Sequence, residues 1–173
     1  MSPWLLTPIL LVASNVLMTF AWYEVMMRRQ LAHLLPLLLA ACAAPAAIRP
    51  PPGAPEQAAA ADWSHATTVT VTLDEFEFTP AQFTLHAGQP VRLRLENVGS
   101  RSHDFTAPGL FGTVALRPDT GQASPLANGG IVEIPFSQTR EVFLLPMQHG
   151  SFDFFCGKPL HATLGMRGRV IVD

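Results

Sequence analysis

The sequence predicts an all-β fold, an antiparallel β-sandwich, over residues 67–173. Apolar and polar residues alternate there in short runs, which is the pattern of strands that bury one face. Gly, Pro and Asn separate these runs at close spacing, and no window after residue 60 shows the period of a useful helix. Seven or eight short strands in just over one hundred residues are typical of a sandwich.

The expected strands follow one another along this region. In the first, threonine alternates with valine and leucine, and Phe76 and Phe78 continue an aromatic face towards a turn at Thr79-Pro80. The stretch Gly112–Gly130 is long for a loop, and loops of that length are usually functional or disordered, although it could hold a turn of helix. The expected strands are residues 67–73, 83–85, 91–96, 131–134, 141–145, 151–155 and 167–172.

A hydrophobic segment, residues 1–25, opens the chain. Its part Pro3–Tyr23 is uncharged and long enough to cross a bilayer as a helix, with Trp4 near one end and Trp22 near the other. This opening resembles the first helix of a family of small multi-span bacterial membrane proteins related to drug/metabolite transporters. The resemblance covers about the first 23 residues, so that family's function is not implied for the rest of the chain.

Residues 26–41 form a second export element. Arg28 and Arg29 make a short basic region, and the apolar run Leu31–Ala41 behind it is too short and too interrupted by proline to span a membrane. The end of this run, Leu-Ala-Ala-Cys, resembles a bacterial lipoprotein signal, in which the cysteine becomes the lipidated N-terminus. We therefore expect lipidation at Cys42, with a chance cysteine in an Ala-rich stretch as the alternative.

Two export elements in tandem are unusual. The hypothesis that accounts for them is that translation starts at Met26 or Met27, and that residues 1–25 belong to an upstream frame or a fusion. The following segment, residues 42–66, is dominated by Ala and Pro and has too few large apolar groups to form a core. We expect it to be a tether between a membrane and a domain at residues 67–173.

Composition excludes several classes of function. The net charge is −2, and basic residues form no run longer than Arg28-Arg29, so the sequence offers no field for nucleic acid. It contains no Gly-rich phosphate loop, no Gly-x-Ser-x-Gly elbow and no Cys-x-x-Cys pair. Its two cysteines, Cys42 and Cys156, lie on opposite sides of the Pro/Ala-rich segment, and we expect each to have a separate role.

The C-terminal segment contains the residues that indicate chemistry. Cys156, His161 and Met166 are a thiol, an imidazole and a thioether at intervals of five, on a loop between two expected strands. A second imidazole is available from His103, which follows the strand at residues 91–96. Two imidazoles with a thiolate and a weak axial thioether favour copper in an electron-transfer geometry, whereas the thioether would add little to a zinc site.

Strand alternation places the thiol inside the sandwich. Phe152, Phe154 and Cys156 share one face of their strand, and the two phenylalanines make that face the core side. A buried thiolate without a counter-charge would be costly, and a bound copper ion offsets that charge.

The segments Asn97 to Asp104 and Cys156-x₄-His161-x₄-Met166-x-Gly resemble the cupredoxins, the small blue-copper family of plastocyanin, azurin and amicyanin. The resemblance covers about residues 67–173 and implies a Greek-key sandwich with one type 1 copper ion. It implies His103, Cys156 and His161 as equatorial ligands and Met166 as the axial ligand. It also places Asn97 and Asp104 around them, although the family often has Asn where this chain has Asp104.

The four expected ligands imply an electron carrier that is not an enzyme and has no small-molecule substrate. The N-terminal segments imply that it is periplasmic and membrane-anchored. A redox partner would dock transiently near His161, and an apolar collar around it is expected from Leu110, Phe111, Pro159, Leu160 and Leu164. A copper chaperone or sequestration protein with the same ligands is the alternative. A multicopper enzyme would need further ligands such as His-x-His pairs, and this sequence has none. A dinuclear copper domain would need a second cysteine in the loop, where this chain has Leu160.

Overall fold

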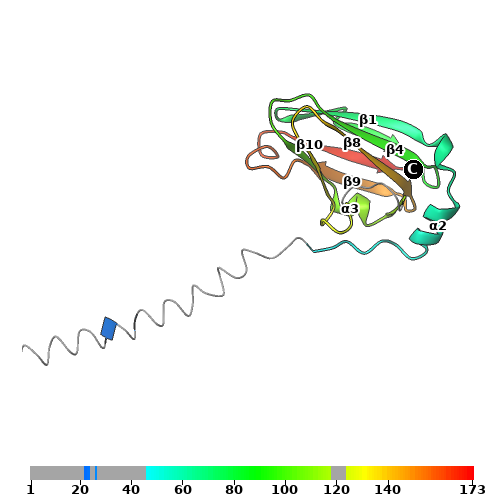
Figure 1. Ribbon diagram of the computed structural model, residues 1–173, viewed down its shortest axis with the longest axis horizontal. Coiled ribbons are helices and arrows are strands. Elements are labelled where there is room, and N and C mark those ends of the chain that lie inside the picture. Colours follow the sequence, from blue (N-terminus) through cyan, green and yellow to red (C-terminus); the bar gives the residue numbers. More distant parts are fainter. Residues whose placement is uncertain (1–21, 24–25, 27–45, 118–123) are drawn as a thin grey trace, which may run out of the picture. The chain divides into compact units, whose positions relative to one another are not determined.

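The computed structural model describes residues 22–23, 26, 46–117 and 124–173 (Figure 1). The chain divides into two compact units, Met1–Ala44 and Pro45–Asp173. The expected segments 1–25 and 26–41, and Cys42, therefore lie outside the described residues, apart from Trp22, Tyr23 and Met26, which are helical. Among the residues described, no helix has the length and apolar character needed to cross a membrane.

The second unit is a sandwich of two five-stranded sheets, which confirms the predicted fold class (Figure 1). The first sheet has the order β2-β1-β4-β8-β6 and the second has the order β3-β10-β9-β5-β7. The first comprises β1 (Thr67–Asp74), β2 (Glu77–Thr79), β4 (Val91–Asn97), β6 (Val114–Leu116) and β8 (Thr139–Pro146). The second comprises β3 (Gln82–Leu85), β5 (His103–Thr106), β7 (Ile131–Ile134), β9 (Gly150–Phe155) and β10 (Arg167–Val172).

The strand pairing differs from the purely antiparallel prediction in two places. β1 runs parallel to β4, and β3 runs parallel to β10. The physical reason is a crossover, because the chain leaves the first sheet after β2, contributes β3 to the second sheet and returns to place β4 beside β1. Alternation within a strand reports which face is buried, not the direction of the neighbouring strand, so the sequence pattern could not predict this.

The core lies between the sheets and is built from the alternating apolar residues. β4 buries Val91, Leu93 and Leu95 and directs the residues between them outwards. Two aromatic rings from the opposite sheet, Phe105 and Phe154, stack with their centroids 4.8 Å apart. Burying one such side chain contributes about 1.5–3 kcal/mol, so these rows of apolar residues provide the main stabilisation of the sandwich.

Two short strands and a short helix complete the fold where the sequence pattern indicated only turns or a loop. All four residues of β5 are buried, so they show no alternation of apolar and polar residues. The stretch Gly112–Gly130 contains β6 near its start, and its described parts, residues 112–117 and 124–130, contain no helix. A helical turn, α3 (Pro108–Phe111), lies just before this stretch and buries Leu110 and Phe111.

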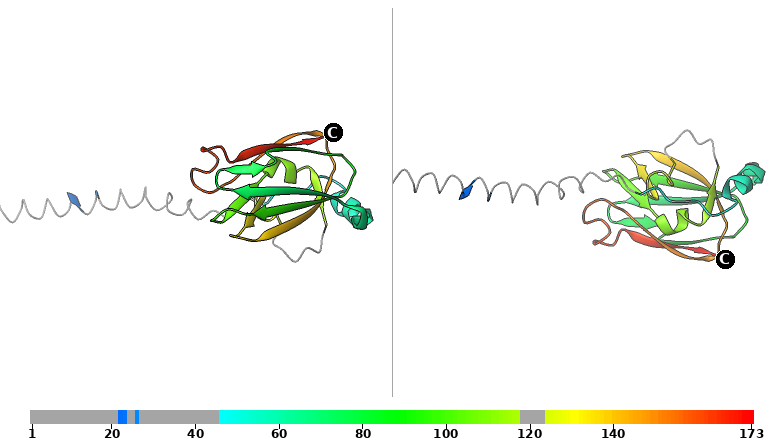
Figure 2. Two further views of the ribbon diagram at one scale, coloured as in Figure 1. Left: turned by 90° about the horizontal axis from the view of Figure 1, so that it is seen from above. Right: turned by 90° about the horizontal axis from the view of Figure 1, so that it is seen from below.

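Residues 46–66, the described part of the expected tether, pack on the sandwich, and we call them the N-terminal strap. The backbone N–H of Ile48 donates to the carbonyl of Leu126 over 2.7 Å. The strap then forms α2 (Ala54–Ala60) and a 3₁₀ turn, η1 (Trp63–His65). α2 lies at the end of the sandwich that also holds the C-terminus, opposite the loop between β9 and β10 (Figure 2).

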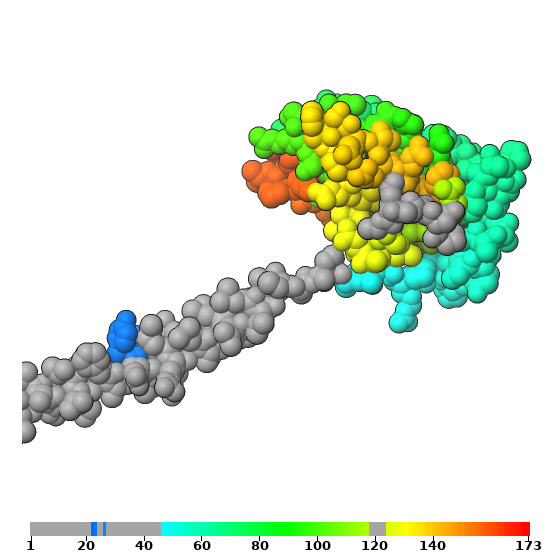
Figure 3. Space-filling view, in the orientation of Figure 1, coloured from blue at the N-terminus to red at the C-terminus, as the bar shows by residue number. Residues whose placement is uncertain are grey.

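Small side chains explain why this segment packs although it has few large apolar residues. Ala54 and Ala58 of α2 are buried against Ala115 and Leu145. Alanine brings a helix backbone close to the sheet and loses no side-chain rotamer freedom. The strap therefore covers one end of the sandwich as part of the domain (Figure 3).

Candidate metal centre

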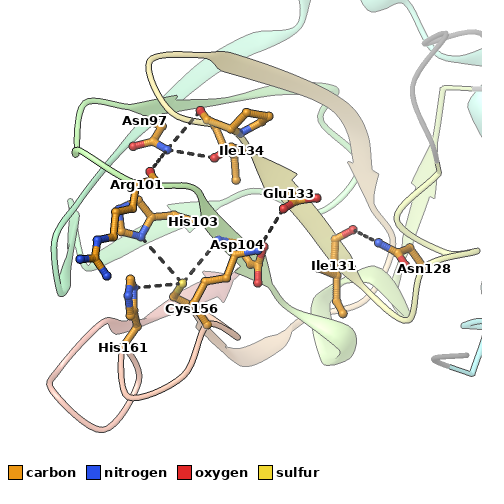
Figure 4. A network of polar contacts seen from close by, with 12 residues as sticks. Asn97, Arg101, His103, Asp104, Asn128, Ile131, Glu133, Ile134, Cys156 and His161 are labelled. Carbon is orange, nitrogen blue, oxygen red and sulfur yellow. Dashed lines mark hydrogen bonds and ion pairs between the residues drawn. The ribbon is translucent and has the colours of Figure 1, made fainter. Parts of the chain in front are cut away.

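Three buried side chains from the two expected segments meet at the end of the sandwich opposite α2. The ligand atoms of His103, Cys156 and His161 all lie within 4.8 Å of one another. The Cys156 Sγ is 3.6 Å from Nδ1 of His161 and 3.9 Å from Nδ1 of His103 (Figure 4). Among the described residues, these form the only group of three or more His, Cys, Asp or Glu side chains placed to hold a metal.

The first half of the centre, the strand arm, comprises residues 97–104. β4 ends at Asn97, whose buried side-chain amide holds the turn that leads to His103 (Figure 4). Its Nδ2 donates to the carbonyls of Arg101, Ile134 and Pro135 at 2.7, 2.9 and 3.2 Å, and its Oδ1 accepts from the N–H of Gly99. Asn97 thereby ties the turn to the end of β7 and fixes the start of β5.

Gly99 lies in this turn, and its lack of a side chain leaves the space that His103 and Glu75 occupy. A Cβ added at Gly99 would lie 2.8 Å from Nε2 of His103 and 2.9 Å from Oε2 of Glu75. Oε1 of Glu75 accepts 2.7 Å bonds from both the N–H and the hydroxyl of Ser100. These bonds, the hydroxyl bond foremost, hold the pKa of Glu75 at about 2. Nothing in the sequence pattern pointed to Glu75, because it reaches the turn from a different strand end.

The second half of the centre, the loop arm, comprises residues 156–166 between β9 and β10. The Cys156 N–H donates to the Met166 carbonyl over 3.0 Å, and the Met166 N–H donates to the His161 carbonyl over 2.9 Å. Two residues, Leu160 and Gly165, have left-handed backbones with φ of 67° and 115°, and they give the loop its tight course. The loop thus brings the five-residue spacing of the sequence into one closed turn.

Met166 is fully buried at the end of this loop. Its backbone bonds to both Cys156 and His161, so the loop holds this residue next to both of them. The role of its thioether as a weak axial ligand follows from the resemblance and stays a prediction.

The thiol of Cys156 is buried, as the alternation with Phe152 and Phe154 predicted. Burial raises the pKa of this thiol, and the backbone N–H groups of Asp104 and Lys158, which donate to Sγ, oppose part of that rise. The Asp104 N–H lies 3.4 Å from the sulfur. A buried thiol of this kind favours a partner that can neutralise the thiolate, which is what a bound metal cation does.

The imidazole of His103 is fully buried. Burial lowers its pKa, and the neighbouring His161 lowers it further. A neutral imidazole is the form that binds a metal, so the surroundings of His103 favour its ligand form.

The spacing of the three ligand atoms fits one shared ion. Two atoms bound at about 2.0 and 2.3 Å, and about 120° apart, are separated by roughly 3.7 Å. The observed separations from Sγ, 3.6 and 3.9 Å, lie on either side of that value. The soft donor set of one thiolate and two imidazoles, with a thioether nearby, selects copper.

The outer face of the centre contains part of the expected apolar collar. Leu160 and Leu164 are 70% and 58% exposed, and Pro159 is also exposed. The rings of Phe76 and His161 pack edge to face, with centroids 5.2 Å apart. Leu110 and Phe111, expected in the collar, are instead fully buried core residues, because α3 turns both side chains inwards.

Comparison with known proteins agrees with this geometry. Residues 34–172 match the model of the cupredoxin-like domain family. The chain is 32% identical over 132 residues to the copper-resistant cuproprotein CopI of Rubrivivax gelatinosus, covering 70% of this chain and 73% of that protein.

Among solved structures, reduced auracyanin of Roseiflexus castenholzii is 18% identical. That match covers 62% of this chain and 98% of the other, with a TM-score of 0.47. Auracyanin B is 20% identical over 62% of this chain and 89% of its own, with a TM-score of 0.46. The family match and the relationship to CopI show that this chain belongs to the cupredoxins, as a copper-binding member with a single copper ion as its cofactor.

Proposed function

We propose that this protein is a blue-copper electron carrier that works outside the cytoplasm and transforms no substrate. The observation that carries the proposal is the buried group of His103, Cys156 and His161, preformed at one end of the sandwich. Copper bound there would supply a one-electron Cu(I)/Cu(II) couple.

The surroundings of these residues support repeated electron transfer. The strand arm is fixed by the Asn97 amide, and the loop arm is closed by the Cys156–Met166 backbone bond. Rigid supports of this kind keep ligand positions alike in both oxidation states, so that little rearrangement accompanies each transfer. Burial of all three side chains also keeps water away from the thiolate.

The surface beside His161 supports a transient redox partner. Leu160 and Leu164 lie on the same short loop as His161 and are largely exposed, while His161 itself is 8% exposed. A small apolar patch buries limited area, which suits brief docking more than a permanent complex. We expect electrons to enter and leave at this face.

The proposed location rests on the N-terminal residues. Cys42 would be lipidated after cleavage of the signal at residues 26–41, or the apolar segment 1–25 would anchor the chain. We expect either anchor to hold the copper domain near a membrane, and the signal at residues 26–41 to direct it outside the cytoplasm.

Copper handling is the second candidate, and one observation favours it. The relative CopI is described as a copper-resistant cuproprotein. A sequestration protein could use the same four side chains. The complete burial of His103 favours the carrier, because copper exchange with other molecules requires accessible ligands.

The first experiment tests the copper centre itself. Adding Cu(II) to the full-length protein should produce an intense visible thiolate-to-copper absorption band. The matched variant Cys156→Ser removes the thiolate with minimal change in size, and it should lose the band completely. A wild-type protein without the band, or a variant that keeps it, would refute the blue-copper proposal.

A second experiment separates the two candidate functions. A carrier should show a reversible reduction potential and fast electron exchange, and should lose copper slowly to a competing chelator. A copper chaperone should release copper to the chelator readily, a sequestration protein should retain it, and both should exchange electrons slowly. Slow electron exchange would therefore favour copper handling, and the rate of copper loss would separate its two forms.

A further inference from the structure

Lys158 lies inside the loop arm, between Cys156 and His161, and it is the only lysine in the sequence. Its ammonium group contacts two carboxylates from the neighbouring strands. Nζ lies 2.9 Å from Oε1 of Glu133 on β7 and 3.3 Å from Oδ1 of Asp104 on β5. These three residues, which we call the Lys158 network, join the loop arm to both strands.

The two carboxylates need a cation between them. Asp104 and Glu133 are directly opposite each other in the antiparallel pairing of β5 and β7. Like charges in opposite positions destabilise a sheet, and the ammonium group of Lys158 offsets that repulsion. The loop that supplies three of the four proposed copper ligands therefore also supplies the charge that balances this strand pair.

Burial strengthens the interaction on the Asp104 side. The Asp104 side chain is 12% exposed and that of Lys158 is 29% exposed, whereas Glu133 is 58% exposed. Burial raises the pKa of Asp104, and the charge of Lys158 opposes that rise. Burial also acts to lower the pKa of Lys158, but the bond to Glu133 and the charge of Asp104 outweigh it, so this pKa is raised. Because water screens the Asp104–Lys158 pair only partly, removing either charge should change the electrostatic potential at the copper centre.

Gly157 allows the loop to approach Asp104 closely. A Cβ added there would lie 3.3 Å from Oδ2 of Asp104 and 3.4 Å from Oγ1 of Thr106. The first distance is tighter than most Cβ contacts and the second is at the limit of ordinary van der Waals contact, so an added side chain would require Asp104 or the loop to shift by a few tenths of an ångström.

The same two residues also hold the sulfur through their backbones. The N–H groups of Asp104 and Lys158 both donate to Sγ of Cys156. A shift in the side-chain pair would therefore move both donors. Such donors, together with nearby charge, are what tune a metal ligand in proteins.

We propose that the Lys158 network is a positioning device that holds the loop arm against β5 and, through the charge of Lys158, sets the reduction potential of the copper centre. This inference deepens the proposed function and rests on it, because an electron carrier depends on its potential. It assigns roles to Lys158 and Glu133 as well as to the side chain of Asp104.

The proposal predicts potential shifts of opposite sign. Lys158→Met removes a positive charge beside the centre, which should stabilise Cu(II) and lower the potential. Asp104→Asn removes a negative charge with little change in shape and should raise the potential. Glu133→Gln should raise it less, because water screens this more exposed carboxylate.

The experiment measures the reduction potential of the copper-loaded full-length protein and its variants. Lys158→Arg keeps the charge and should retain most of the wild-type potential. Arg49→Met removes the same charge from the N-terminal strap and should leave the potential unchanged. Gly157→Ala crowds the loop without changing charge, and its shift shows the effect of displacement alone.

Two results would overturn the proposal. Shifts of the same sign in Lys158→Met and Asp104→Asn would mean that the network acts only as a structural support. A Lys158→Met shift no larger than that of Arg49→Met would exclude a local role. Failure of the proposed function is distinguishable, because the wild-type protein would then lack the visible band or reversible potential before any variant is compared.

A separate readout uses the apo protein. Labelling with ¹⁵N-lysine gives a single backbone amide signal, because Lys158 is the only lysine. That signal should shift in Asp104→Asn and Glu133→Gln and stay in place in Arg49→Met.

We also expect Lys158→Met to weaken copper binding about 10-fold, the lower end of the effect for residues that support metal ligands.

Discussion

The two arms of the centre are held in different ways. In the strand arm, the amide of Asn97 bonds three carbonyls, and His103 is fully buried. In the loop arm, the support comes from backbone bonds and the Lys158 network, and the loop exposes Leu160 and Leu164. One ligand is thus fixed by the fold, while the others lie on a segment that also forms the surface.

The difference shows how the chain combines rigidity with access. Buried amide bonds are costly to break, so the strand arm has one stable arrangement. Backbone turns and a partly exposed ion pair are weaker, so we expect the loop arm to adapt more readily to contact with the proposed partner. Changes in the strand arm should therefore lower stability, and changes in the loop arm should alter access and potential.

Asn97→Ala should have the largest effect on stability. It removes donors from three carbonyls, of which the bond to Ile134 is buried. We expect the free energy of unfolding of the apo protein to fall by about 2–4 kcal/mol, measured by urea denaturation. Asn128→Ala, which removes one bond to Ile131, is the control and should cost about 1 kcal/mol. An equal loss in the two variants would contradict the special role of the strand arm.

Phe76→Ala tests the loop arm and should have a smaller effect on stability. The Phe76 ring packs edge to face with His161, and Phe76 has φ of 66°, a backbone that favours glycine. We expect a loss of about 1 kcal/mol and faster chemical modification of His161 in the apo protein. Phe76→Gly should cost less than Phe76→Ala, because it relieves the left-handed backbone. Unchanged reactivity of His161 would show that Phe76 does not shield it.

Glu75→Gln should have the smallest effect on stability, and this effect should be detectable only at acidic pH. The folded-state pKa of Glu75 is about 2, lowered from 4.5 mainly by the Ser100 hydroxyl. A depressed pKa stabilises the fold above pH 4.5, and that contribution is lost as the pH falls towards 2. The variant should therefore lose stability less steeply over this range, measured by urea unfolding of the apo protein. If the free energy of unfolding of the variant fell with pH as steeply as that of the wild-type protein, the bond to Ser100 would not form in solution.

The sequence was informative where the pattern was local. The five-residue spacing of Cys156, His161 and Met166 predicted that these residues share one loop between two strands, and the alternation around Phe154 predicted a buried thiol. Strands with one buried face were predicted to within a few residues. In each of these cases, near neighbours in the chain determine the outcome.

Features that depend on distant parts of the chain could not be predicted in this way. Glu133 reaches Lys158 only because β7 pairs with β5, and Glu75 reaches the turn before His103 from the end of β1. β5 is buried throughout, so its sequence lacks the alternation of apolar and polar residues that indicates a strand with one exposed face. The parallel pairs likewise arise from a crossover between sheets.

The N-terminal strap has a consequence for how the protein behaves in a crowded compartment. β6 lies at the edge of its sheet, and α2 packs Ala54 and Ala58 on the face formed by Ala115 of β6 and Leu145 of β8. An exposed apolar face beside an edge strand favours association with other molecules. A chain cut at Thr67, where the alternation begins, would expose that face, so we expect it to aggregate more readily than the full-length protein.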